Sequence, residues 1–253
     1  MLAELLTDEV FSFLFVFTRV GAALMLLPGI GDAYVTPRIR LLLGLMITAL
    51  VLPALMPALP PVPDSPLILF VLVAGEILVG VFIGLIARLM LAALEIAGMV
   101  ISFQISLANA FVFNPAMTTQ GTLVGAFLTI LGLVLIFLAD LHHLMLAAVV
   151  ESYDVFPPGG APPIGDMADL VSRLVAESFL IGVQVSGPFL VIGLIFYLGL
   201  GLLNRLMPQV QIFFIAMPLQ IVMGIAVMAL TVSAMMLFWL NRFQDSLVGF
   251  VSS

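Results

Sequence analysis

Long apolar runs separated by short breaks dominate the pattern along this chain. Each run is about 18 residues or longer, the length at which an apolar helix can cross the hydrocarbon core of a bilayer. Proline and glycine clusters mark most of the breaks. The pattern therefore predicts an all-α integral membrane protein, with residues 1–253 forming a single membrane domain. The six apolar segments are residues 10–27, 41–59, 67–107, 121–150, 177–203 and 212–240.

The third apolar segment is too long for a simple span. As one helix, residues 67–107 would extend about 60 Å at about 1.5 Å per residue, roughly twice the thickness of the hydrocarbon core. We therefore expect this segment to tilt, to kink or to extend beyond the bilayer.

One face of this third segment carries small residues and charges at steps of three or four positions. Small residues at this spacing allow a second helix to approach closely. A charge within a span is costly in lipid, so this face is expected to contact protein or water. The pattern favours structural charges satisfied inside a helix bundle, and the lining of a conduction path is the alternative. The residues of this face are Gly80, Gly84, Arg88, Ala92 and Glu95.

An uncharged connector lies in the middle of the chain at residues 97–120. Its sequence, AGMVISFQISLANAFVFNPAMTTQ, is rich in Phe and Met and is interrupted at Asn114 and Pro115. Such a segment suits neither water nor lipid, because it combines apolar side chains with a broken backbone. It is best accommodated inside protein or along a pore.

A polar cluster of Asp140, His142 and His143 interrupts the fourth segment. These side chains are typical of metal sites and of proton relays. A zinc site needs converging ligands, and the sequence offers no obvious fourth one, so we predict no metal. A hydrogen-bond cluster at a helix end is favoured. Together with other charges in the spans, these residues form the candidate set for buried polar contacts in assembly: Glu76, Arg88, Glu95, Asp140, His142 and His143.

The composition supports the membrane class and excludes several others. Hydrophobic residues make up 64% of the chain and charged residues 8%, whereas a soluble domain has about 25% charged residues. The mean hydropathy is +1.35. There is no Cys, and all seven basic residues are Arg, so disulfides, thiolate chemistry and a basic face for nucleic acid are excluded. No phosphate loop, HExxH or G-x-S-x-G motif occurs, so we predict neither an enzyme nor a cofactor.

Arginine placement predicts an orientation in the membrane. Arg38 and Arg40 follow the first segment and Arg205 follows the fifth, so these two loops are expected on the cytoplasmic side, with both termini on the other side. The longest polar stretch, residues 151–176, is predicted to be an acidic loop rich in Pro and Gly.

Three stretches in a fixed order carry a resemblance to a known family. They are QISLANAFVFNPAMTTQG at residues 104–121, FLADLHHLMLAAVVESYDVFPPG at 137–159 and GLLNRLMPQVQIFFIAMPLQIVMG at 201–224. In order and spacing the chain resembles the FliR/SctT family of type III export-gate membrane proteins, over nearly its whole length. FliR-type members serve the flagellum, and SctT-type members serve virulence secretion.

The resemblance implies a specific architecture and a set of partners. It implies kinked helical hairpins, with residues 1–150 similar to FliP and residues 177–253 similar to a FliQ hairpin. The partners that it implies are FliP-like and FliQ-like subunits, FlhB-like and FlhA-like membrane proteins, and unfolded protein substrates, with no nucleic acid. It also implies a place in the bacterial inner membrane, in the flagellar basal body.

Two functional segments are implied by the same resemblance. Residues 106–119 match the family's central loop, which closes the pore as a plug centred on Asn109, Ala110, Phe111, Val112, Phe113, Asn114 and Pro115. The loop between the last two segments matches the cytoplasmic hairpin tip, with Asn204, Arg205, Pro208 and Gln209.

The function implied by the resemblance is a subunit of the flagellar type III protein export gate, forming part of a gated conduit for unfolded flagellar proteins. Two alternatives remain open at this point. One is the SctT-type counterpart in a virulence system, and the other is a stand-alone small-solute transporter. A transporter of that kind is expected to contain an internal repeat, and the sequence has none of 20–50 residues.

Overall fold

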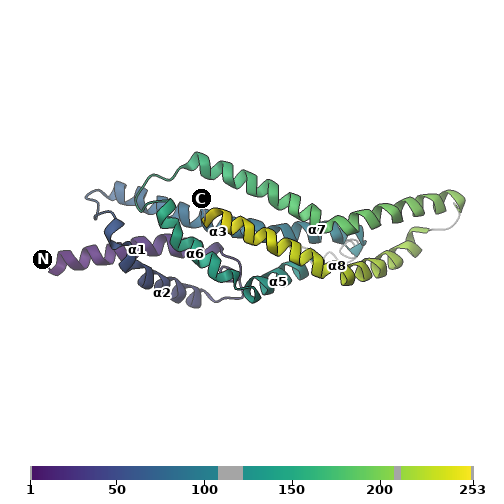
Figure 1. The fold of residues 1–253 in the computed structure, drawn as a ribbon, viewed down its shortest axis with the longest axis horizontal. Coiled ribbons are helices and arrows are strands. Elements are labelled where there is room, and N and C mark those ends of the chain that lie inside the picture. Colours follow the sequence, from purple (N-terminus) through teal and green to yellow (C-terminus); the bar gives the residue numbers. More distant parts are fainter. Residues whose placement is uncertain (1, 108–121, 208–211, 252–253) are drawn as a thin grey trace. The chain divides into compact units, whose positions relative to one another are not determined.

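The structure, a computed structural model, describes residues 2–107, 122–207 and 212–251 (Figure 1). All regular secondary structure in these ranges is helical. The described elements are α1 (Leu2–Leu26), α2 (Pro37–Leu55), a short 3₁₀ helix η1 (Met56–Ala58), α3 (Pro66–Gln104), α5 (Leu123–Leu138), α6 (Leu141–Val155), α7 (Ile164–Leu206) and α8 (Ile212–Val251).

The long apolar helices confirm the all-α integral membrane class. Helices α1, α2, α3, α7 and α8 each contain a stretch long and apolar enough to cross a bilayer. Helices α5 and α6 pass the same test only as a pair, and they are bent by 76° at the break between them. With this bent pair counted as one span, the described helices match the six predicted segments.

The break in the fourth predicted segment lies at Ala139 and Asp140. Asp140 has φ +56°, in the left-handed region that ends an α-helix and that Asp tolerates better than most residues. The backbone therefore leaves α5 and restarts as α6 in a new direction. The fourth predicted segment therefore consists of two helices, α5 and α6, that meet at a bend.

The prediction of a loop over residues 151–176 is wrong in extent. Helix α6 continues to Val155 and helix α7 begins at Ile164, so the connection is shorter than predicted. Pro162 and Pro163 directly precede α7 and prevent its extension toward the N-terminus. Asp166 lies in the first turn of α7. A carboxylate is favourable there because it faces the positive end of the helix dipole. The acidic residues thus mark helix ends outside the apolar stretches.

Helices α3, α7 and α8 are single long helices. Helix α3 contains 39 residues, α7 contains 43 and α8 contains 40. At about 1.5 Å per residue, each is roughly twice as long as the hydrocarbon core is thick. The predicted length of the third segment is therefore confirmed, without a break in the helix.

The chain divides into two compact units. Unit 1 contains residues 1–90, 136–174 and 243–253, and unit 2 contains residues 91–135 and 175–242. Helices α3, α5, α7 and α8 contribute residues to both. The two units are described separately below.

In unit 1, helix α1 packs along α2 and against α3. Gly80 of α3 faces the Arg19 carbonyl and Ala22 of α1, and Gly84 faces Leu26 and the Ala23 carbonyl. A Cβ atom at either glycine would collide with α1, so the small residues of the predicted face permit this close helix contact. Phe15, Val20 and Leu24 of α1 are fully buried in the resulting core.

In unit 2, glycines again set the closest helix contacts. Gly98 of α3 faces the backbone of Gly125 on α5, with no room for a Cβ atom. Gly182 of α7 faces Ile96 of α3. Close approach at these points lets Leu94, Ile101, Leu128 and Trp239 reach almost complete burial.

Candidate functional site

A buried ion pair joins α1 to α3 in unit 1. Arg19 Nε lies 2.6 Å from Glu76 Oε2, and Arg19 Nη2 lies 3.0 Å from Glu76 Oε1. This is the two-pronged geometry in which a planar guanidinium best recognises a carboxylate. Both side chains are at most 3% exposed. The Arg19 and Glu76 charges thus neutralise each other inside protein, as charges in apolar helices must.

Hydrogen bonds satisfy the remaining polar atoms of this pair. Arg19 Nη1 donates to the backbone carbonyls of Ser152 at 3.1 Å and Phe156 at 2.9 Å. The backbone N–H of Gly159 donates to Glu76 Oε1 at 3.1 Å. The pair therefore fixes the end of α6 and the loop after it to α1 and α3.

Tyr153 covers the guanidinium from α6. Its ring centroid lies 4.1 Å from Arg19 Cζ, a cation–π distance, and its hydroxyl donates to the Val16 carbonyl at 3.2 Å. A cavity of about 250 Å³ adjoins the pair, lined by Glu76, Phe156 and the proline-rich connection, among others. Because the Arg19 nitrogens already have protein partners, we assign this network a structural role.

Sequence reasoning identified half of this network. Glu76 belongs to the predicted set of buried polar residues and is 2% exposed, whereas Arg19 is not in that set. The signal was present in part, because Arg19 is the single charge in residues 10–27, whereas Glu76 shares its apolar segment with Arg88 and Glu95. Such charges need partners, but the sequence alone does not show which acidic residue meets Arg19.

Arg88 lies on the surface of unit 1 and pairs with Asp32, in the loop after α1. The Arg88 side chain is 45% exposed and that of Asp32 is 15% exposed. Asp32 also accepts a hydrogen bond from the Gly29 N–H at 2.9 Å, which holds the carboxylate in place. Glu95, in unit 2, is exposed and has no hydrogen-bond or ion-pair partner among the residues that the structure describes.

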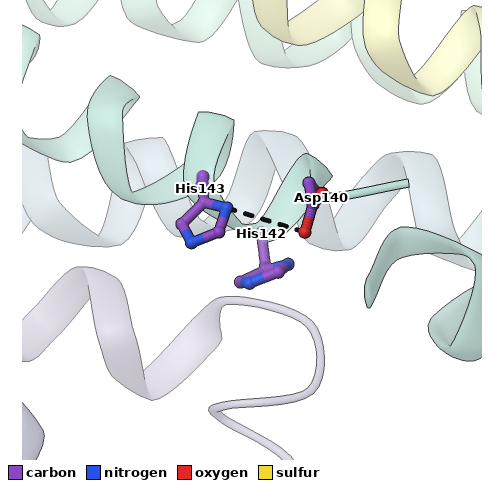
Figure 2. Close-up of side chains that lie close together, drawn as sticks. All are labelled: Asp140, His142 and His143. Carbon is purple, nitrogen blue, oxygen red and sulfur yellow. Dashed lines mark ion pairs between the residues drawn. The ribbon is translucent and has the colours of Figure 1, made fainter. Parts of the chain in front are cut away.

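The predicted Asp140, His142 and His143 cluster forms at the start of α6 (Figure 2). His143 Nδ1 lies 3.8 Å from Asp140 Oδ1, with both side chains more than two-thirds exposed. His142 stacks on Phe137, with ring centroids 4.9 Å apart, and its Nδ1 atom is buried without a hydrogen-bond partner within the described part of the chain.

Three potential ligand atoms of this cluster lie within 4.8 Å of one another. A zinc ion holds its ligands at about 2.0–2.2 Å, so the three atoms would have to converge further to bind one. No fourth Asp, Glu or His joins the group within the described ranges. The arrangement fits an exposed helix-end cluster better than a metal centre.

The predicted plug and hairpin tip are only partly covered by the structure. Asn109, Ala110, Phe111, Val112, Phe113, Asn114 and Pro115 lie outside the described residues, as do Pro208 and Gln209. Asn204 and Arg205 are exposed at the end of α7.

A second buried polar cluster, in unit 2, surrounds Gln220 of α8. Gln220 is 3% exposed and forms hydrogen bonds with Ser106, Gln104 and Tyr197. It is not among the predicted site residues. Its signal in the sequence is a single amide side chain within an apolar segment.

Comparisons with known proteins give matches over nearly the whole chain. Residues 10–246 match the family described as bacterial export proteins, family 1. The chain is 41% identical to the flagellar biosynthetic protein FliR of Caulobacter vibrioides over 92% of each chain. It is 30% identical to FliR of Escherichia coli over 83% of this chain and 80% of that one. It is 25% identical to Yop proteins translocation protein T of Yersinia pestis over 87% and 85% of the two chains.

We predict that Arg19→Leu and Glu76→Leu each destabilise the protein by about 3–5 kcal/mol, because each leaves one buried charge unpaired. The double variant should lose less than the sum of the two single losses, since it leaves neither charge. Chemical unfolding in detergent micelles measures these free energies. Arg173→Leu, which removes an exposed arginine of α7 in the same unit, is the matched control and should be close to neutral. Additive losses in the double variant would contradict the pairing.

Proposed function

Because this chain belongs to the bacterial export proteins, family 1, and is a FliR-type subunit of the type III protein export gate, we propose that it forms part of a gated conduit for unfolded flagellar proteins. The observation that carries this proposal is the family match over residues 10–246, with 41% identity to a FliR over 92% of both chains. The resemblance inferred from the sequence motifs is thereby confirmed.

The flagellar role is favoured over the virulence role. Identity to the Caulobacter FliR is 41%, whereas identity to the Yersinia translocation protein is 25% over a similar share of the chain. We propose that the protein lies in the bacterial inner membrane, at the flagellar basal body.

The proposed partners are FliP-like and FliQ-like subunits within the gate, together with FlhB-like and FlhA-like membrane proteins. Residues 1–150 would take the place of a FliP-like subunit, and residues 177–253 that of a FliQ-like hairpin. Many large apolar side chains of α2, α7 and α8 are exposed, including Leu50, Leu194 and Leu230, which suits contact with lipid or with neighbouring subunits. Asn204 and Arg205 are exposed and so available to an FlhB-like partner.

Residues 106–119 are proposed to plug the conduit at rest, with residues 109–115 at the centre. This segment carries no charge and contains Phe111 and Phe113. An apolar constriction excludes water, and with it ions, without needing a charged barrier. The protein would act as a passive gate, with the energy for transport supplied by other components.

We propose that Glu95 contacts a neighbouring subunit. It is exposed on α3, within a helix long and apolar enough to span a bilayer, and it lacks a partner among the described residues. A charge in that position is costly unless protein or water surrounds it. Asp140, His142 and His143 are further candidates for such contacts, whereas Arg88 already pairs with Asp32 in the same chain.

The test of the gate assignment is purification from the native host with an affinity tag on this chain. FliP-like and FliQ-like subunits should copurify, and a strain lacking the chain should fail to export flagellar subunits and to swim. Recovery of a homo-oligomer alone, with export intact in the deletion strain, would instead support a stand-alone transporter.

Substitution of Glu95 should weaken the assembly of this chain with its FliP-like and FliQ-like partners. In Glu95→Arg, the yield of copurified partners should fall by roughly tenfold, the scale expected when a desolvated contact of opposite charges becomes repulsive. Glu151→Arg, which reverses an exposed charge at the end of α6, is the matched control. Equal yields from both variants would remove Glu95 from the interface.

Deletion of residues 110–114 should raise the resting ion conductance of assembled gates, because the apolar constriction is lost. The measurement is ion flux through purified gates in lipid vesicles. Subunit composition should be unchanged, which separates a leak from failed assembly. Conductance equal to that of the unmodified gate would exclude the plug role.

A further inference from the structure

The C-terminal end of α3 is enclosed by α7 and α8 in unit 2. Ile101, Ile105 and Ser106 are 0%, 4% and 6% exposed. Two glycines make room for this end of α3, since Gly193 of α7 faces the Gln104 side chain and Gly224 of α8 faces Ile105. A Cβ atom at either glycine would collide with these residues. The two helices thus form a notch that receives the end of α3.

Gln220 of α8 completes this notch with hydrogen bonds. Its Oε1 accepts from Ser106 Oγ at 2.7 Å, and its Nε2 donates to the Tyr197 hydroxyl of α7 at 3.1 Å. Nε2 also donates to the backbone carbonyl of Gln104. Both ends of the amide are therefore used, and one side chain connects α3, α7 and α8.

The contact with Gln104 satisfies a group that the helix itself leaves open. Gln104 is the last residue of α3, and the last carbonyls of a helix have no partner within it. Away from water, an unpaired carbonyl is costly, so a donor from another helix is needed. The Gln220 amide supplies that donor and caps α3.

The contact with Ser106 supports a backbone turn. Ser106 has φ +59°, a left-handed conformation that is unfavourable for residues other than glycine. Its hydroxyl bond to Gln220 offsets part of this cost. The turn redirects the chain directly after α3, and its geometry depends on a side chain of α8.

We propose that Gln220 is a positioning residue for export, which fixes the end of α3 against α7 and α8 through Gln104, Ser106 and Tyr197. This inference rests on the proposed function as a gate subunit. It adds a specific coupling: movement of α8 relative to α7 transmits to the end of α3, because Gln220 holds all three helices. The resistance of the resting gate to ion leakage then depends on the Gln220 side-chain amide.

The test compares purified gates in lipid vesicles carrying single and double substitutions. Gln220→Met keeps the side-chain volume and removes every bond of the amide. Ser106→Gly removes the hydroxyl and accepts the left-handed turn. Each should raise resting ion flux by roughly tenfold, the scale expected when buried polar groups lose their partners, while subunit recovery stays unchanged. The double variant should leak no more than the leakier single variant, because both act through the same contact.

Two matched controls separate positioning from general damage. Thr231→Val removes a hydroxyl from the same helix, where the bonds of Thr231 to described residues stay within α8, to the Val227 carbonyl and Met235. Gly224→Leu fills the notch and should leak like Gln220→Met. Gly187→Leu should match the unmodified gate, because no atom of the described residues lies within 4 Å of a Cβ added at Gly187. Additive leaks from Gln220→Met and Ser106→Gly, or a tight Gln220→Met gate, would overturn the proposal.

A second variant tests the proposal if the Gln220→Met protein does not fold or is not recovered in gates. Tyr197→Phe removes only the hydroxyl bond, and normal flux in both Tyr197→Phe and Ser106→Gly would also refute the positioning role. The gate assignment is tested independently by copurification of FliP-like and FliQ-like subunits, and the plug role by the deletion of residues 110–114. A leak from that deletion with tight gates from all notch variants would leave the proposed function standing and exclude only this inference.

Discussion

The need for polar groups within an apolar medium to find partners shapes both units of this structure. Water is absent from the bilayer core, so a lone charge or an open carbonyl there cannot be compensated by solvent. Unit 1 meets the requirement with the Arg19 and Glu76 pair, whose remaining atoms bond to Ser152, Phe156 and Gly159. Unit 2 meets it with neutral groups around Gln220. In both units the polar cluster lies where helices distant in sequence come together.

Glycine contacts and polar clusters support each other. Apolar attraction between helices is weak in lipid, because the lipid chains are as apolar as the side chains. Close backbone approach provides van der Waals contact instead, and it brings short polar side chains within bonding range. Gly80 lies one turn beyond Glu76 on α3, and the Arg19 backbone packs on Gly80 while the Arg19 side chain reaches Glu76. Packing and charge pairing are thus two aspects of one contact.

The sequence predicted the all-α integral membrane class and the family of the chain. Apolar run length predicted the long helices, because a span needs a minimum number of apolar residues whatever its neighbours are. The limits of α6 and α7 were missed since charged residues at helix ends resemble loop residues in composition. The partners of Arg19 and Gln220 could not be paired from spacing, because 57 residues separate Arg19 from Glu76 and 114 separate Ser106 from Gln220. The plug centre at residues 109–115 remains a prediction from resemblance.

The bend of 76° between α5 and α6 has a consequence for how the protein is made. A continuous apolar helix satisfies its own backbone and can enter the bilayer alone, before any partner is present. A helix broken at Asp140 interrupts the regular main-chain hydrogen bonding of the segment and places an exposed carboxylate at the break. Such a segment is stable at depth only when other protein surrounds it. The insertion of this segment into the bilayer is therefore coupled to the folding of the protein around it.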